Sequence, residues 1–241
     1  MNDRLNNTVG MGAETDLGLR SFMLGTYRYM AMAMAVTATV AYLTSLYLAG
    51  NPQALGIIYN PIMSLVFLGV VMFGFGAVGK KLPSMSLGGV LTFLFGFAAF
   101  MGVFMSGIAF AYNPMIIAKI FFMTVAMFAG LSIFGYTTGF NLSSIIKYAI
   151  IAFVAYIAIN ILGMFIPAFA PTGMVDMVIT AIAGIAIAVI IAWETQMLKR
   201  IYHGSVGNPA MMGKLSAFGA ASLLLSFINL FHILLSLFGR E

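Results

Sequence analysis

Glu194 is the side chain of this sequence with the clearest chemical potential. It lies in the segment IIAWETQMLKR, five residues before Lys199 and inside a long apolar run. A carboxylate at membrane depth costs roughly a few kcal/mol unless it is paired, hydrated or protonated. One interpretation is a carboxylate that lines a cavity and responds to protons or cations. The alternative is an interfacial acid held by Lys199, Arg200 or water.

Further polar side chains occur in the last apolar run, LSAFGAASLLLSFINLFHILLSLF. Asn229 and His232 are three residues apart, which places them on one face of a helix. The serines of this run, among them Ser226, are expected to join helices by hydrogen bonds worth about 1 kcal/mol each. His232 is either a proton relay or a neutral histidine bonded inside a bundle. Direct pairing of His232 with Glu194 is not expected, because the two lie near opposite ends of their helices.

The composition shows what must position these groups. Hydrophobic residues make up 62% of the 241 residues and charged residues only 7%, whereas soluble proteins carry about 25% charged residues. This excludes a soluble enzyme and a disordered chain. Cysteine is absent, so disulfides and thiolate chemistry are excluded. The net charge of +5 does not indicate nucleic-acid binding in so apolar a chain.

The apolar residues form seven continuous runs, each near the 20 residues that a transmembrane helix needs. We therefore predict an all-α membrane protein, a bundle of seven transmembrane helices within residues 22–241. Residues 1–21 are predicted to form a polar N-terminal tail, without a cleaved signal peptide. All seven prolines fall in predicted connections or near helix ends, where a missing N–H costs least. The predicted spans are Tyr29–Gly50, Pro61–Gly79, Met85–Phe110, Met115–Phe134, Tyr148–Phe169, Val175–Leu198 and Leu215–Phe238.

The basic residues are distributed unevenly between the two sides that seven spans define. Lys119 and Arg240 are the only basic residues on one side, and the other side carries the remaining nine of the eleven. Cytoplasmic loops are enriched in Lys and Arg. The pattern predicts a cytoplasmic N-terminus in the plasma membrane, which in a bacterium is the inner membrane.

Motifs for enzymatic chemistry are missing from the sequence. There is no HExxH metalloprotease motif, no pair of intramembrane aspartates and no G-x-S-x-G nucleophile elbow. We therefore expect no enzyme, no cofactor and no resident metal site.

Three segments in order resemble the bacterial, YccA-like branch of the Bax inhibitor-1 family: GYTTGFNLSSIIK, AWETQMLKRIY and KLSAFGAASLLLSFINLFHILLSLFGR. The resemblance covers most of the chain. It implies a seven-helix bundle with the seventh helix at its centre, surrounded by the other six. It also implies a pH-sensitive calcium leak, and it links the family to the control of membrane-bound AAA proteases.

The resemblance assigns the pH sensing to two acidic residues that share a proton. Glu194 takes the place of the family's aspartate on the sixth helix, and Ser226 takes the place of the aspartate on the seventh. A serine cannot share a proton as a second acid would, nor can it supply a second anionic calcium ligand. A sensor with one carboxylate then remains, with Ser226 and Asn229 as its neutral partners. His232 is a separate candidate for proton sensing.

Two functions follow as alternatives. The first is a pH-sensitive cation channel, with calcium as the conducted ion and Glu194 as the sensor. The second is a non-conducting regulator that binds a membrane-bound AAA protease or another membrane partner. Both place the protein in a lipid bilayer, and neither involves nucleic acid.

Overall fold

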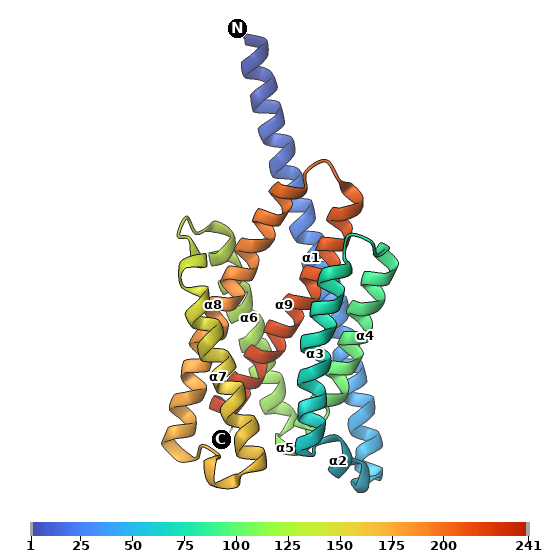
Figure 1. Cartoon of the computed structure of the whole chain (residues 1–241), viewed down its shortest axis with the longest axis vertical. Helices are drawn as coiled ribbons and strands as arrows, with labels where there is room; N and C mark the ends of the chain where they lie inside the picture. The colour runs from blue at the N-terminus through green and yellow to red at the C-terminus, as the bar shows by residue number, and fades with distance from the viewer. Residues whose placement is uncertain (1, 240–241) are drawn as a thin grey trace.

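The computed structural model describes the backbone of residues 2–239 and the side chains of residues 17–239. Within this part of the chain all regular structure is helical, as predicted. Figure 1 shows the helices running roughly parallel to one long axis, with α9 crossing the bundle between the others. The elements are α1 (Asn2–Gly50), α2 (Pro52–Ile58), α3 (Pro61–Lys81), α4 (Leu87–Met105), α5 (Ile108–Ala111), α6 (Pro114–Thr137), η1 (Leu142–Ser144), α7 (Ile146–Phe165), η2 (Pro167–Phe169), α8 (Gly173–Ser205) and α9 (Pro209–Phe238).

Seven stretches of the described residues are helical, long and apolar enough to cross a membrane, which confirms the predicted number of spans. They are Leu17–Gly50, Pro61–Lys81, Leu87–Ala111, Pro114–Thr137, Ile146–Phe165, Gly173–Ser205 and Pro209–Phe238. Helix α1 continues on the N-terminal side of the first stretch, from Asn2, and its residue Leu19 is buried. The side chains of residues 1–16, and with them most of the predicted tail, lie outside the described residues.

Asn-Pro pairs set the start of several helices. Proline occupies the first turn of α3, α6 and α9, and the preceding Asn60, Asn113 or Asn208 accepts a hydrogen bond from a backbone N–H of that turn. Asparagine satisfies N–H groups that have no partner within the helix, and proline has no N–H to satisfy. Asn208 therefore starts α9 six residues before the predicted span.

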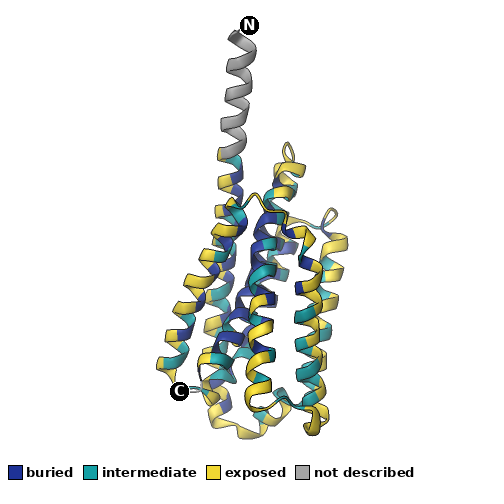
Figure 2. Cartoon of the chain, turned by 90° about the vertical axis from the view of Figure 1, so that its left-hand side faces the viewer, coloured by how far each residue is buried: buried dark blue, intermediate teal, exposed yellow. Residues whose placement is uncertain are grey.

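Helix α9 is the most buried of the candidate spans, since 56% of the residues in an apolar stretch of 18 residues are buried inside the protein. It packs against α1, α4, α6 and α8, and the ring of Phe218 also contacts Phe75 of α3. Figure 2 shows the buried residues collected on the inside of the bundle. Helix α3 is the opposite case, because none of its residues is buried.

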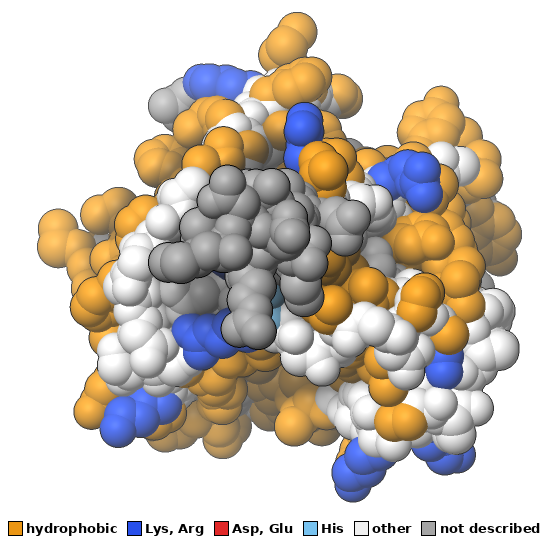
Figure 3. Space-filling view, turned by 90° about the horizontal axis from the view of Figure 1, so that it is seen from above, with side chains coloured by type: hydrophobic (Ala, Val, Ile, Leu, Met, Phe, Trp, Pro, Cys, Tyr) orange, Lys and Arg blue, Asp and Glu red, His pale blue; other side chains and the backbone are white. Residues whose placement is uncertain are grey.

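One end of the bundle carries most of the described basic residues. Seen from that end, Lys and Arg side chains are spread around the rim (Figure 3). Nine basic residues have described side chains, and only Lys119, near the start of α6, lies toward the other end. Arg4 and Arg240 lie outside the described side chains. The remaining eight are Arg20, Arg28, Lys80, Lys81, Lys147, Lys199, Arg200 and Lys214.

Candidate functional site

Glu194 lies in the interior of the bundle. Its side chain is only 7% exposed, in a stretch of α8 where Thr195 and Gln196 are also buried. The hydroxyl of Ser222 on α9 donates a hydrogen bond to Glu194 Oε1. Among the described residues, neither Lys199 nor Arg200 bonds the carboxyl: Lys199 donates to the carbonyl of Tyr136, and Arg200 donates to the α6–α7 connection. Of the two interpretations of Glu194, the geometry favours an interior carboxylate over an interfacial acid.

The second carboxyl oxygen, Glu194 Oε2, is buried without a hydrogen-bond partner in the described part of the chain. Ser226, one turn after Ser222 on α9, also interacts with the carboxyl. Ser222 and Ser226 thus approach Glu194 from the same face of one helix. Since a buried acceptor without a partner is costly, this oxygen is the atom of the site most able to bind a proton, a water or a cation.

A cavity of about 160 Å³ adjoins Glu194 between α3, α8 and α9. Gly79 of α3 and Leu82, which follows that helix, line it together with Glu194, Ser222 and Leu215. Gly79 lies near the end of α3 and Leu215 near the start of α9, both toward the basic end of the bundle. The cavity therefore extends from Glu194 toward that end, which is called its outer part below. On the other side of Glu194 the α9 side chains are tightly packed, with Leu230 fully buried and Ile233 1% exposed. The carboxyl is therefore closer to the basic end than to the opposite end.

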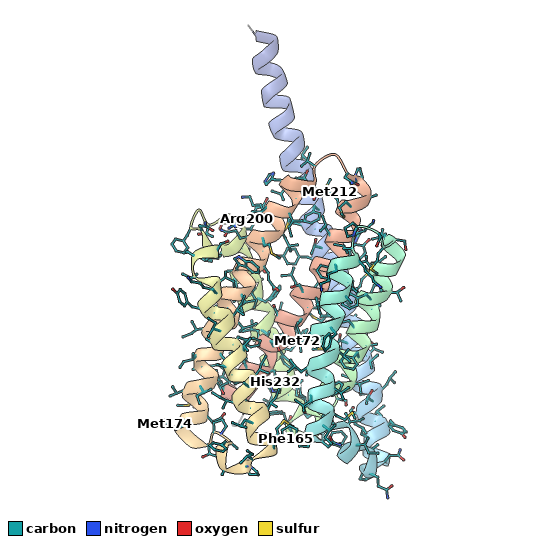
Figure 4. All side chains as sticks on the ribbon, viewed as in Figure 1. Met72, Phe165, Met174, Arg200, Met212 and His232 are labelled. Atoms are coloured by element: carbon teal, nitrogen blue, oxygen red, sulfur yellow. The ribbon has the colours of Figure 1, made fainter. Side chains whose placement is uncertain are left out.

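Asn229 and His232 do not join this site. Asn229 is half-buried and His232 is exposed on the bundle surface, so the interpretation of His232 as a histidine bonded inside the bundle does not hold. The buried face of α9 carries Leu230, Ile233 and Leu234, and His232 projects to one side of that face. Ten residues separate Ser222 from His232, about 15 Å along a helix, so His232 does not pair with Glu194. In Figure 4, His232 lies well below Arg200.

Among the described side chains, no second acid lies beside Glu194 in place of the one that the resemblance predicts at position 226. Asp176 and Glu194 are the acidic residues among the described side chains, and both are on α8. They are 18 residues apart, about 27 Å along the helix. In residues 17–239 no group of three or more His, Asp or Glu side chains is placed to hold a metal ion.

The residues that follow Glu194 hold the connection between α6 and α7 against α8. Gln196 accepts from the backbone N–H of Leu142 at 3.1 Å and donates to the carbonyl of Phe140 at 2.8 Å. Arg200 donates to Ser143 at 2.8 Å and to Asn141 at 3.0 Å, and also to Gln196. Two neighbouring polar side chains of α8 thus have different partners, since Glu194 faces α9 and Gln196 faces the connection.

A close contact between α6 and α8 holds the backbone of α8 in place near Glu194. A Cβ atom on Gly135 of α6 would lie 2.8 Å from the carbonyl carbon of Ala192, two residues before Glu194. Thr195 is linked to α1 by a 3.3 Å hydrogen bond with the hydroxyl of Tyr27. The backbone of α8 near Glu194 is therefore held by α6 on one side and by α1 on another.

Sequence reasoning identified Glu194 and Ser226 but missed Ser222 and Gln196. Ser222, Ser226 and Asn229 follow the spacing of one helix face, so the signal for Ser222 was present. From the sequence alone, Ser222 is only one of several serines that are expected to join helices. The role of Gln196 had no signal in the sequence, because its partners are backbone groups more than fifty residues away.

Comparison with known proteins agrees with this architecture. Residues 19–241 match the family model described as "Inhibitor of apoptosis-promoting Bax1". The chain is 30% identical over 233 residues to an uncharacterized protein of Caulobacter vibrioides, covering 93% of this chain and 90% of that one. It is 28% identical over 226 residues to the inner membrane protein YbhL of Escherichia coli, covering 93% of both chains. It is 29% identical over 249 residues to an uncharacterized membrane protein of Streptococcus pyogenes, covering all of both. The chain therefore belongs to the Bax inhibitor-1 family of multi-pass membrane proteins.

Proposed function

We propose that this protein is a slow cation leak pathway whose conduction depends on the protonation of Glu194. One observation supports the proposal most directly: Glu194 Oε2 is buried without a hydrogen-bond partner in the described residues and belongs to a residue that lines a cavity. An ionised carboxylate in such a place needs a counter-charge or water. A cation entering the cavity would supply that charge, and a proton would remove the need for it. Calcium is the cation that the sequence resemblance implies.

The surroundings of the cavity are consistent with a slow leak. Lys80 and Lys81 end α3 near its outer part, and like charges raise the barrier for an approaching cation. Beyond Glu194 the α9 side chains Leu230 and Ile233 are buried, and in this proposal they close the path. In this proposal the structure corresponds to a closed state, and conduction requires the helices on that side to separate.

The test is calcium flux into liposomes that contain the purified protein, measured with an entrapped dye between pH 5 and pH 8. Glu194→Gln keeps the shape of the side chain but cannot ionise, so its flux should not change with pH. Ser216→Ala is the matched control, because Ser216 lies on α9 and bonds Thr26 rather than Glu194. Identical flux from the native protein and Glu194→Gln at every pH would refute the proposal.

The second candidate is a non-conducting regulator of a membrane partner, for which the resemblance suggests an AAA protease. It is favoured by one observation, the serine at position 226 where the resemblance predicts the second acid of a leak pathway. On this alternative the native protein gives no flux above protein-free liposomes at any pH. Deletion of residues 1–20 should then abolish partner binding while the helices remain inserted.

We also propose that the N-terminus is cytoplasmic and that the membrane is the bacterial inner membrane. The concentration of basic residues at the end where the first span begins supports this orientation. It places the cavity beside Glu194 nearer the cytoplasm.

A further inference from the structure

A groove of about 910 Å³ lies between α1 and α6. Phe227 of α9 lines it between the two helices, so α1 and α6 form its walls. The walls are mostly apolar, and several of their side chains are exposed, including Leu24 at 60% and Val125 at 40%. In a membrane such a groove faces the acyl chains of lipids.

The groove has a basic region at one end. Arg20 and Leu24 line the groove and also a second, smaller pocket of about 330 Å³, which adds Ser21 and Arg28. Arg20, Leu24 and Arg28 follow each other at intervals of four residues, so they share one face of α1. Neither arginine makes a salt bridge with an acidic residue in the described part of the chain, and both are exposed. The two pockets together form an apolar groove that continues into a basic site.

A polar group without a partner also lines the groove. Ser132 of α6 is 6% exposed, and its hydroxyl has no hydrogen-bond partner among the described residues. A serine inside a helix can bond the carbonyl four residues earlier, but Ser132 does not. The rings of Tyr27 and Tyr136 line the same part of the groove, and tyrosine is enriched where lipid chains meet headgroups.

We propose that this groove binds an anionic phospholipid of the leaflet at the basic end. The phosphate is held by Arg20 and Arg28, the glycerol ester region lies near Ser132 and the two tyrosines, and one acyl chain lies along the groove. The dimensions fit, since the lining of α1 extends from Arg20 to Met34. The 14 steps between these two residues rise about 21 Å, which is longer than the hydrocarbon part of one leaflet, about 15 Å. The proposal does not depend on conduction or on Glu194.

The experiment measures lipid binding by native mass spectrometry of the full-length protein in a neutral detergent. Phosphatidylglycerol is titrated against phosphatidylcholine with the same acyl chains. We expect tighter binding of phosphatidylglycerol, and roughly 30-fold weaker binding of it after the double substitution Arg20→Gln and Arg28→Gln, from the usual contribution of each basic residue near an anionic headgroup. The control is Lys80→Gln with Lys81→Gln, which removes the same charge from the same end but away from the groove. It should change the affinity less than threefold.

A second variant tests the groove itself. Ala129 lines it and is exposed, so Ala129→Trp should fill the groove without disturbing the core, and the tightly bound phosphatidylglycerol should be lost. Equal weakening by the arginine and lysine double substitutions would overturn the proposal, as would unchanged binding to Ala129→Trp. Competition by millimolar inorganic phosphate would also overturn it, because the site would then bind free anions rather than a lipid.

Discussion

Replacement of Gln196 by methionine should destabilise the protein far more than its position at a loop contact suggests. The substitution keeps the volume and flexibility of the side chain but removes both of its polar atoms. The backbone N–H of Leu142, a buried residue, then has no acceptor, which costs about 1–3 kcal/mol. Loss of the bond to the Phe140 carbonyl adds about 1 kcal/mol. At about 2–4 °C per kcal/mol for a chain of this size, a total near 3 kcal/mol lowers the Tm by roughly 6–12 °C.

The comparison variant is Arg200→Ala, which removes the same number of hydrogen bonds to the connection, two, as Gln196→Met does. Its bonds to Asn141 and Ser143 are exposed, so their loss should cost less than about 1 kcal/mol and lower the Tm by less than about 4 °C. The Tm is measured by heating the purified protein in detergent and quantifying the monodisperse fraction by size-exclusion chromatography. The reasoning fails if Gln196→Met melts within 2 °C of the native protein, or if Arg200→Ala has the larger effect.

Three further outcomes can be measured in the same way or by labelling. Gly135→Ala should lower the Tm by several degrees, because its Cβ would overlap the Ala192 carbonyl group, whereas Gly130→Ala, with no neighbour within 4 Å, should leave it unchanged or raise it slightly; the reverse order would contradict the described contact between α6 and α8. Ser222→Ala should lower the Tm by a few degrees, since the buried carboxyl loses its hydrogen bond, and an unchanged Tm would argue against that bond. Because the native chain has no cysteine, Lys80→Cys and Lys119→Cys can each be labelled with an impermeant maleimide. We expect Lys80→Cys to react from the cytoplasmic side and Lys119→Cys from the outside, and the opposite result would invert the proposed orientation.

The number and approximate limits of the spans could be predicted from the sequence, because both depend on local properties. An apolar run of about 20 residues must be a helix in a membrane, and Asn-Pro pairs mark where helices start. The exact ends of the helices differ from the predicted ends, because polar residues next to an apolar run can extend or interrupt a helix. Helix α8 continues to Ser205, beyond the predicted end at Leu198, and the predicted span Met85–Phe110 is interrupted between Met105 and Ile108.

The neighbours of Glu194 could be predicted only in part, because they depend on how each helix is rotated about its own axis. Spacing puts Asn229 on one helix face with His232 and also with Ser226, but it does not give the part of the helix that meets α8. Packing decides this, and it brings Ser222 to the carboxyl while His232 stays at the surface. Glu194 and Gln196, two residues apart on α8, bond different partners, Ser222 of α9 and the connection between α6 and α7. This difference likewise depends on how α6, α7 and α9 pack around α8.

The loose attachment of α3 has a mechanical consequence for the carboxyl beside it. Helix α3 has no buried residues, and its rings, among them Phe67 and Phe75, bridge the space to α4 and α9. Helices α6 and α8, by contrast, meet at Gly135 with almost no space between their backbones. An outward movement of α3 would therefore break its ring contacts with α4 and α9 and its packing against α7. It would not separate two backbones as close as those of α6 and α8. Of the helices around Glu194, α3 is the one that can move outward and admit water to the carboxyl while α6 and α8 stay in contact.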